Sequence, residues 1–125
     1  MKKKAFSPEG IAAVGPYSPA IEINGFIYFS GQIPLDSNTG KIVEGDISVQ
    51  AEQCFKNLLK VLEAANLTTD DIVKATVYLT DMKNFATVNE VYAKFFKSPY
   101  PARTAIEVSS LPLCANIEIE VIACR

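Results

Sequence analysis

The sequence lacks histidine altogether, and its 125 residues also contain no tryptophan. Without histidine the chain cannot form a Ser-His or Cys-His nucleophilic pair, a histidine-based zinc site or the usual general base of neutral pH. Any catalysis by this chain must therefore rest on carboxylates, arginine, hydroxyl groups and backbone atoms.

Cysteine is scarce and poorly spaced for a metal site. Cys54, Cys114 and Cys124 show no Cys-x-x-Cys spacing, and their number is odd. Neither a disulfide framework nor a zinc site is indicated by this pattern. We therefore expect no bound metal and no cofactor.

Strong net charge and long apolar runs are also missing. The net charge of -2 gives no attraction to nucleic acid, and the cluster Lys2 to Lys4 is most simply a solvated terminus. No apolar stretch approaches the roughly 20 residues that span a bilayer. The basic start is followed by Ala5-Phe-Ser-Pro-Glu-Gly rather than by the apolar region of a signal peptide. We expect a cytoplasmic protein without a membrane or nucleic-acid partner.

The length and the hydrophobic content of 49% fit a single domain over residues 1–125. Apolar residues at spacings of three and four predict one helix from Ser48 to Ala65, capped by Asp46 or Ser48, and another from about Asn84 to Phe96. The aromatic stripe of the second helix is more typical of a core than of a base-stacking platform.

Strands are predicted on both sides of these helices. Asn24-Gly25 predicts a hairpin that joins Ile21–Ile23 to Phe26–Ser30. Further strands are predicted at Ile72–Leu79, Thr104–Val108 and Ile117–Ala123. The resulting order of elements indicates an α+β fold in which two helices cover one face of a mixed sheet. Because several strands carry apolar residues on both sides, we expect the other face to be buried against another subunit.

The last strand carries two carboxylates on one side. Ile117, Ile119 and Val121 fall on one face, and Glu118 and Glu120 fall on the other, because side chains alternate along a strand. Arg103 stands at the start of the preceding strand. Spacing alone favours solvated surface residues for all three charges, so a functional role needs a more specific indication.

Five short motifs occur along the chain in this order: Gly15-Pro-Tyr-Ser-Pro-Ala, Phe29-Ser-Gly-Gln-Ile-Pro-Leu, Asn84-Phe-Ala-Thr-Val-Asn-Glu-Val-Tyr, Pro101-Ala-Arg-Thr-Ala-Ile-Glu-Val and Ile117-Glu-Ile-Glu-Val-Ile-Ala. Together they resemble the Rid (YjgF-type) family of reactive-intermediate deaminases, and the resemblance is collinear over essentially the whole chain. It implies a chorismate-mutase-like fold assembled as a homotrimer with clefts between subunits.

The activity that this resemblance implies is that of a 2-iminobutanoate/2-iminopropanoate deaminase, a hydrolase that acts on C=N bonds. Such enzymes convert 2-imino acids and their enamine tautomers, such as 2-aminoacrylate and 2-iminobutyrate, to 2-keto acids and ammonia, which removes reactive intermediates. The task suits a site without histidine, because a protonated imine carbon is already electrophilic and the protein has only to hold a carboxylate and place a water.

The resemblance also assigns roles to individual residues. Arg103 matches the arginine that captures the substrate carboxylate, and Glu118 matches the acid that positions the water. Further substrate-binding positions are matched by Tyr17, Ser30, Gly31, Asn89 and Ala105. Without the resemblance, these segments would be read as a turn, a strand end and a helix-face amide tied to the backbone.

Ala105 departs from the family pattern, since many members carry cysteine there. If the position acts through its backbone carbonyl, the change is harmless, and if a thiol matters, activity is in doubt. We favour the carbonyl, because imine hydrolysis needs no covalent nucleophile.

Competing functions remain open at this point. A non-catalytic trimeric binding or regulatory protein could sense 2-keto acids or similar small carboxylates in the same cleft, but such a sensor needs Arg103 and not Glu118. Nuclease activity or inhibition of translation is ranked last, because this sequence has no basic patch, no histidine pair and no group of metal-binding residues. A mutase acting on a dianion would need more cations than the motifs supply.

The distance between the two proposed catalytic residues suggests a shared site. If Leu111 to Ala115 forms the turn of an antiparallel hairpin, Arg103 lies opposite residue 123 and on the order of 17 Å from Glu118. One small imino acid cannot touch both groups at that distance. We therefore expect Arg103 of one subunit to meet Glu118 of its neighbour.

Overall fold

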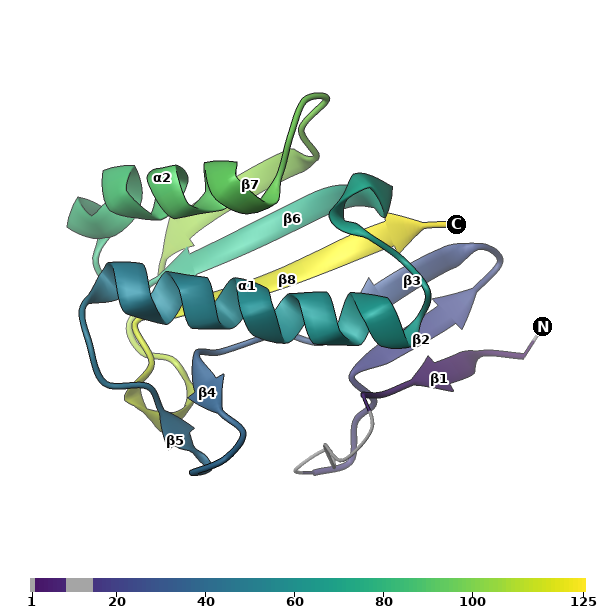
Figure 1. Cartoon of the computed structure of the whole chain (residues 1–125), viewed down its shortest axis with the longest axis horizontal. Helices are drawn as coiled ribbons and strands as arrows, with labels where there is room; N and C mark the ends of the chain where they lie inside the picture. The colour runs from purple at the N-terminus through teal and green to yellow at the C-terminus, as the bar shows by residue number, and fades with distance from the viewer. Residues whose placement is uncertain (1, 9–14) are drawn as a thin grey trace.

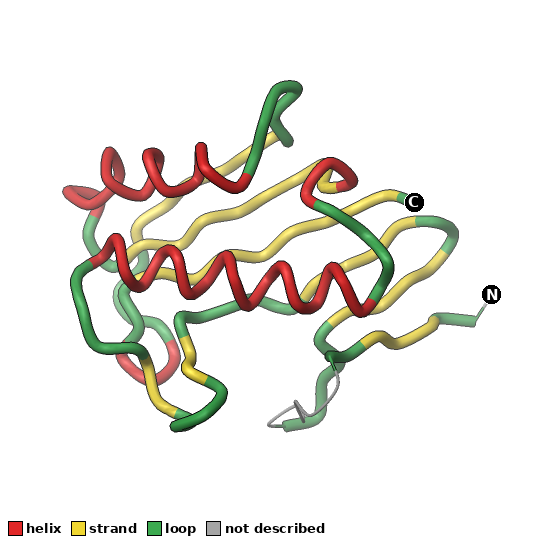
Figure 2. Tube along the Cα trace, in the orientation of Figure 1, coloured by secondary structure: helices red, strands yellow, loops and turns green. Residues whose placement is uncertain are grey.

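The computed structural model describes residues 2–8 and 15–125. A six-stranded sheet carries both helices on one face, with the strand order β1-β2-β3-β8-β6-β7 (Figures 1 and 2). Its strands are β1 (Lys4–Phe6), β2 (Ala20–Ile23), β3 (Phe26–Phe29), β6 (Ile72–Leu79), β7 (Ala102–Glu107) and β8 (Ile117–Cys124). The helices are α1 (Ile47–Ala64) and α2 (Phe85–Phe95), and a separate small ribbon pairs β4 (Leu35–Asp36) with β5 (Lys41–Ile42).

Both predicted helices are confirmed, and α1 begins at a side-chain cap. The carboxylate of Asp46 accepts a hydrogen bond from the backbone N–H of Val49 at 3.1 Å, which satisfies one of the free donors at the helix start. Asp46, rather than Ser48, is therefore the N-cap. The second helix ends at Phe95, close to the predicted end.

The core lies between the helices and the sheet. The ring of Phe55 on α1 stacks on Phe95 at 4.9 Å and meets Tyr92 and Phe96 edge to face. The aromatic stripe of α2 is therefore largely core, as predicted from its spacing. These contacts fix α2 against α1 and so position Phe85 and Tyr92, whose further contacts are described below.

The pairing of the last two strands differs from the expected hairpin. β6 lies between β7 and β8, parallel to β7 and antiparallel to β8. The prediction that Arg103 lies opposite residue 123 is therefore wrong, and Arg103 instead pairs with Ala75 of β6. The predicted hairpin of β2 and β3 around Asn24-Gly25 is confirmed, whereas β1 and the β4–β5 ribbon were not predicted.

The two faces of the sheet differ in cover. Ala75, Val77 and Leu79 of β6 are buried under the helices, as are Ile117, Ile119 and Val121 of β8. The opposite side, here called the open face, carries residues from four strands: Tyr28, Lys74, Thr76, Tyr78, Thr104, Glu118, Glu120 and Ile122. The predicted alternation along β8 is thus confirmed, and burial of the open face against another subunit stays a prediction.

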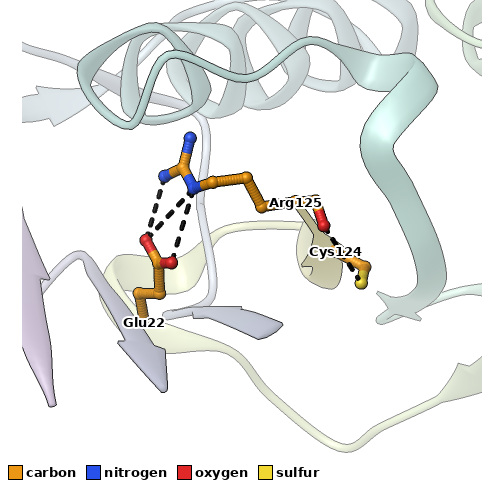
Figure 3. Close-up of polar contacts among 3 residues, drawn as sticks. All are labelled: Glu22, Cys124 and Arg125. Atoms are coloured by element: carbon orange, nitrogen blue, oxygen red, sulfur yellow. Dashed lines mark hydrogen bonds and ion pairs between the residues drawn. The ribbon is translucent and has the colours of Figure 1, made fainter. Parts of the chain in front are cut away.

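The side chain of Arg125 reaches the β1–β2 edge of the sheet. The guanidinium of Arg125 donates to the carboxylate of Glu22, at 3.0 Å from Nη2, so the C-terminus is tied to β2 (Figure 3). This pair lines a cavity of about 370 Å³ together with Lys2, Lys4 and Phe6. No helix in the described ranges is long and apolar enough to cross a membrane.

Candidate functional site

Arg103 lies on the helix face of the sheet, where β7 forms its edge. Its Nη1 donates a hydrogen bond of 2.7 Å to the side-chain oxygen of Asn89 on α2. Within the described part of the chain Arg103 forms no ion pair with a carboxylate. Because the side chain is exposed, its remaining N–H donors are open to a ligand.

Two aromatic rings of α2 hold this guanidinium. Its central carbon lies 5.3 Å from the ring centre of Phe85 and 4.8 Å from that of Tyr92, which are distances of cation–π contacts. Phe85, Asn89 and Tyr92 recur at spacings of four and three and so share one face of α2. The helix therefore restricts the orientation of Arg103 before any ligand binds.

Ala105 lies on the same face of β7 as Arg103, two residues further along. It pairs with the buried Val77 and packs against the core. We call Arg103, Asn89 and Ala105, with the rings of Phe85 and Tyr92, the arginine half-site.

Glu118 lies on the open face, half-buried beside Gly31. A side chain at position 31 would overlap the Glu118 carboxylate as it lies here, because a Cβ built there meets its Oε2, its carboxyl carbon and its Cγ. Glycine at this position therefore lets the backbone approach the carboxylate closely. Burial raises the pKa of Glu118, and the charge of Glu120 raises it further.

Ser30 directly precedes Gly31 in the chain and is linked to the segment that carries Tyr17. The hydroxyl of Ser30 donates to the backbone oxygen of Ser18 at 2.7 Å, which ties the end of β3 to the loop that carries Tyr17. Tyr17 is 53% exposed, so its phenol is free to meet another molecule. We call Glu118, Gly31, Ser30 and Tyr17 the glutamate half-site.

Glu120 has a partner on the neighbouring strand. The Tyr78 hydroxyl donates to its carboxylate at 2.5 Å, across the β6–β8 pair. This hydrogen bond, together with burial and the negative charges of Glu120 and Glu118, raises the pKa of Tyr78 to about 12. Tyr78 therefore remains the proton donor of the pair at neutral pH.

One chain keeps the two half-sites apart. Arg103 pairs with Ala75 and Glu118 with Tyr78, so the two residues lie two strand spacings apart across the sheet and three residues apart along it. These offsets are ~10 Å each, which places the Cα atoms ~14 Å apart. Their side chains also point to opposite faces of the sheet. The separation of Arg103 from Glu118 within one chain is thus found for a different reason than the expected hairpin gave, and their meeting across two subunits stays a prediction.

Sequence reasoning missed three of the residues described here and left a fourth, Glu120, without a role although it placed Glu120 on the face of Glu118. Phe85 and Tyr92 were assigned to the core, although their spacing around Asn89 could have indicated a shared contact. Tyr78 gave no such signal, because strand pairing across 42 residues of sequence is not visible in a local pattern.

Comparison with known proteins gives a consistent picture over the whole length. The family model described as "Endoribonuclease L-PSP" matches residues 8–125. The chain is 49% identical to a RutC family protein of Pyrococcus horikoshii over 98% of both chains. It is 42% identical to the 2-iminobutanoate/2-iminopropanoate deaminase of mouse, over 98% of this chain and 91% of the mouse protein.

A solved structure shows the same fold. A protein of unknown function from Yersinia pestis, described as a member of the conserved Rid family, is 46% identical. It superposes with a TM-score of 0.95 over 99% of this chain and 100% of its own. The arrangement of two helices on a mixed sheet is therefore shared.

Proposed function

We propose that this chain, which belongs to the Rid (YjgF-type) family, hydrolyses 2-imino acids to 2-keto acids and ammonia. The observation that carries the proposal is that the Arg103 guanidinium is already oriented for binding a carboxylate. Its guanidinium is oriented by Asn89 and by two rings, yet no carboxylate of the described chain occupies it. The name of the mouse relative supports the same activity.

The geometry indicates how the substrate carboxylate would bind. Since one N–H of Nη1 is engaged by Asn89, Nε and Nη2 remain as a parallel pair of donors. A carboxylate accepts two parallel hydrogen bonds from such a pair, which fixes its plane as well as its position. The imine carbon next to that carboxylate is then held in one orientation for attack by water.

Glu118 is the residue that we assign to the water. In the proposed reaction it accepts a proton from water as the oxygen bonds to C2, and the C=N bond becomes a C–N bond. Glu118 then returns this proton to nitrogen, the C–N bond breaks with release of ammonia, and the remaining hydroxyl gives its proton to Glu118 as it becomes the keto oxygen. The raised pKa of Glu118 suits this exchange, because it brings the carboxyl closer to neutral pH.

The site requires a neighbouring subunit in this proposal. Because Arg103 and Glu118 point to opposite faces of one sheet, the arginine half-site of one chain would meet the glutamate half-site of another. A ring of three such contacts closes a homotrimer, with one cleft at each interface. The open face, with a cavity of about 240 Å³ lined by Tyr28, Lys74 and Glu120 among others, would lie toward the interior of that assembly.

The direct test generates the imine in solution. A threonine or serine dehydratase releases 2-iminobutyrate or 2-aminoacrylate, and keto acid formation is followed with and without this protein. We expect the wild-type chain to accelerate hydrolysis and Arg103→Ala to abolish the acceleration. Lys56→Ala, which removes an exposed cation of α1, is the matched control and should behave as wild type. A wild-type rate equal to that of buffer would end the proposal.

A further inference from the structure

Two carboxylates lie side by side on the open face, and they differ in their hydrogen bonds. Glu118 and Glu120 are two residues apart on β8, so their side chains project from the same side of the strand. Glu120 accepts a hydrogen bond from Tyr78. Glu118 accepts no hydrogen bond from any residue that the structure describes, and it is half-buried beside Gly31.

Tyr78 is the residue that distinguishes the two carboxylates. In the register of β6 and β8 it lies directly opposite Glu118, but its hydroxyl reaches diagonally to Glu120. A hydroxyl that donates to a carboxylate stabilises the ionised form of that carboxylate. When two neighbouring acids have environments that separate their protonation states, one serves as a fixed anion and the other as the group that exchanges protons.

We propose that Glu120 is a positioning residue, whose carboxylate is held beside Glu118 by the hydrogen bond from Tyr78 and thereby makes Glu118 the member of the pair that takes up a proton. Glu120 touches no reacting atom in this scheme and acts only through Glu118. The inference deepens the proposed function and rests on it for its catalytic meaning.

The other charged and titratable groups around Glu118 leave this role to Glu120. Lys74 of β6 donates to Thr104 at 2.9 Å. Cys54 of α1 lies beneath, and burial and the Glu118 charge raise its pKa, so it remains a neutral thiol. Tyr28 of β3 lines the cavity beside Glu120. In the proposed cleft the neighbouring subunit would add Arg103, which is the same in every variant compared below.

Glu120→Gln tests the proposal with little change of shape. The amide oxygen can still accept from Tyr78, so the substitution removes the charge and keeps the contact. Carbon-13 label in the side-chain carboxyl groups of glutamate reports the protonation of Glu118 by NMR, and its signal is assigned by its loss in Glu118→Gln. We expect the Glu118 titration to move to lower pH in Glu120→Gln, and the acid limb of kcat/KM to move in the same direction.

Two further variants separate charge from structure. Glu120→Asp keeps the charge, so its Glu118 titration should stay closer to wild type than that of Glu120→Gln. Glu63→Gln removes an exposed carboxylate of α1 and should leave the titration unchanged. A Glu118 titration in Glu120→Gln that coincides with wild type would overturn the inference, and so would an equal shift in Glu63→Gln. Absence of deaminase activity in the wild type would refute the proposed function instead, while the NMR comparison would still decide the role of Glu120.

Discussion

Mixing two inactive variants tests whether the site is shared between subunits. Arg103→Ala chains keep an intact glutamate half-site, and Glu118→Ala chains keep an intact arginine half-site. Neither variant can complete a site with copies of itself, because each lacks one of the two residues. If the site is shared, as we propose from the ~14 Å separation on opposite faces of one sheet, a cleft in a mixed ring is complete wherever an intact Arg103 of one chain meets an intact Glu118 of the next.

The expected recovery follows from counting neighbours. In trimers reassembled at random from equal amounts of the two variants, each cleft has the required pair of chains in about one case in four, so about a quarter of wild-type activity should return. The assay is keto acid formation after dissociation and reassembly, with subunit exchange verified by mass spectrometry of differently labelled chains. No recovery despite verified exchange would refute the reasoning.

A second mixture guards against a misleading result. Wild-type chains are mixed equally with chains that carry both substitutions. A shared site again leaves about a quarter of the clefts intact, whereas a site built within one chain leaves about half of them intact. The two arrangements thus differ twofold in this control and completely in the first mixture.

Three single substitutions test the parts of the site. Arg103→Lys should lower kcat/KM by about tenfold to a hundredfold, because an ammonium cannot present two parallel donors and a charged hydrogen bond contributes roughly 1.5–3 kcal/mol. Near wild-type turnover of this variant would mean that Arg103 does not bind the substrate carboxylate in this way. Glu118→Gln should slow hydrolysis by about 10²–10⁴-fold while a 2-keto acid still binds in a calorimetric titration, because the amide cannot take a proton from water. If turnover were normal, the base would have to be another group. Gly31→Ala should displace the Glu118 carboxylate and reduce turnover with retained circular dichroism.

Local patterns predicted most of the elements because each depends on neighbouring residues. The apolar periodicity of α1 and α2 and the alternation of β6 and β8 reflect burial on one face, and burial follows residue type. The Asn24-Gly25 turn predicted its hairpin for the same local reason. The short β1 and the β4–β5 ribbon were missed, since strands of two or three residues leave no alternation to detect.

Strand partners and the paired contacts of the site could not be predicted in this way. Nothing in the segment from Arg103 to Glu118 shows that β6 lies between β7 and β8. The parallel pairing of β6 with β7 across the α2 connection depends on contacts between residues far apart in the sequence. The Tyr78 partner of Glu120 depends on the same order of strands. The positions of Arg103 and Glu118 on their strands were predictable. Their neighbours on adjacent strands became known only with the order of strands in the sheet.

The central position of β8 has a consequence for the folding of the molecule. This strand comes after β3 and β6 in the sequence, yet it lies between them and makes the hydrogen bonds that join them. Before β8 is in place, the chain therefore holds two unjoined pieces of sheet, each with an unpaired edge. Because unpaired edges invite pairing with other chains, the docking of β8 is the folding step that protects this protein from misassembly.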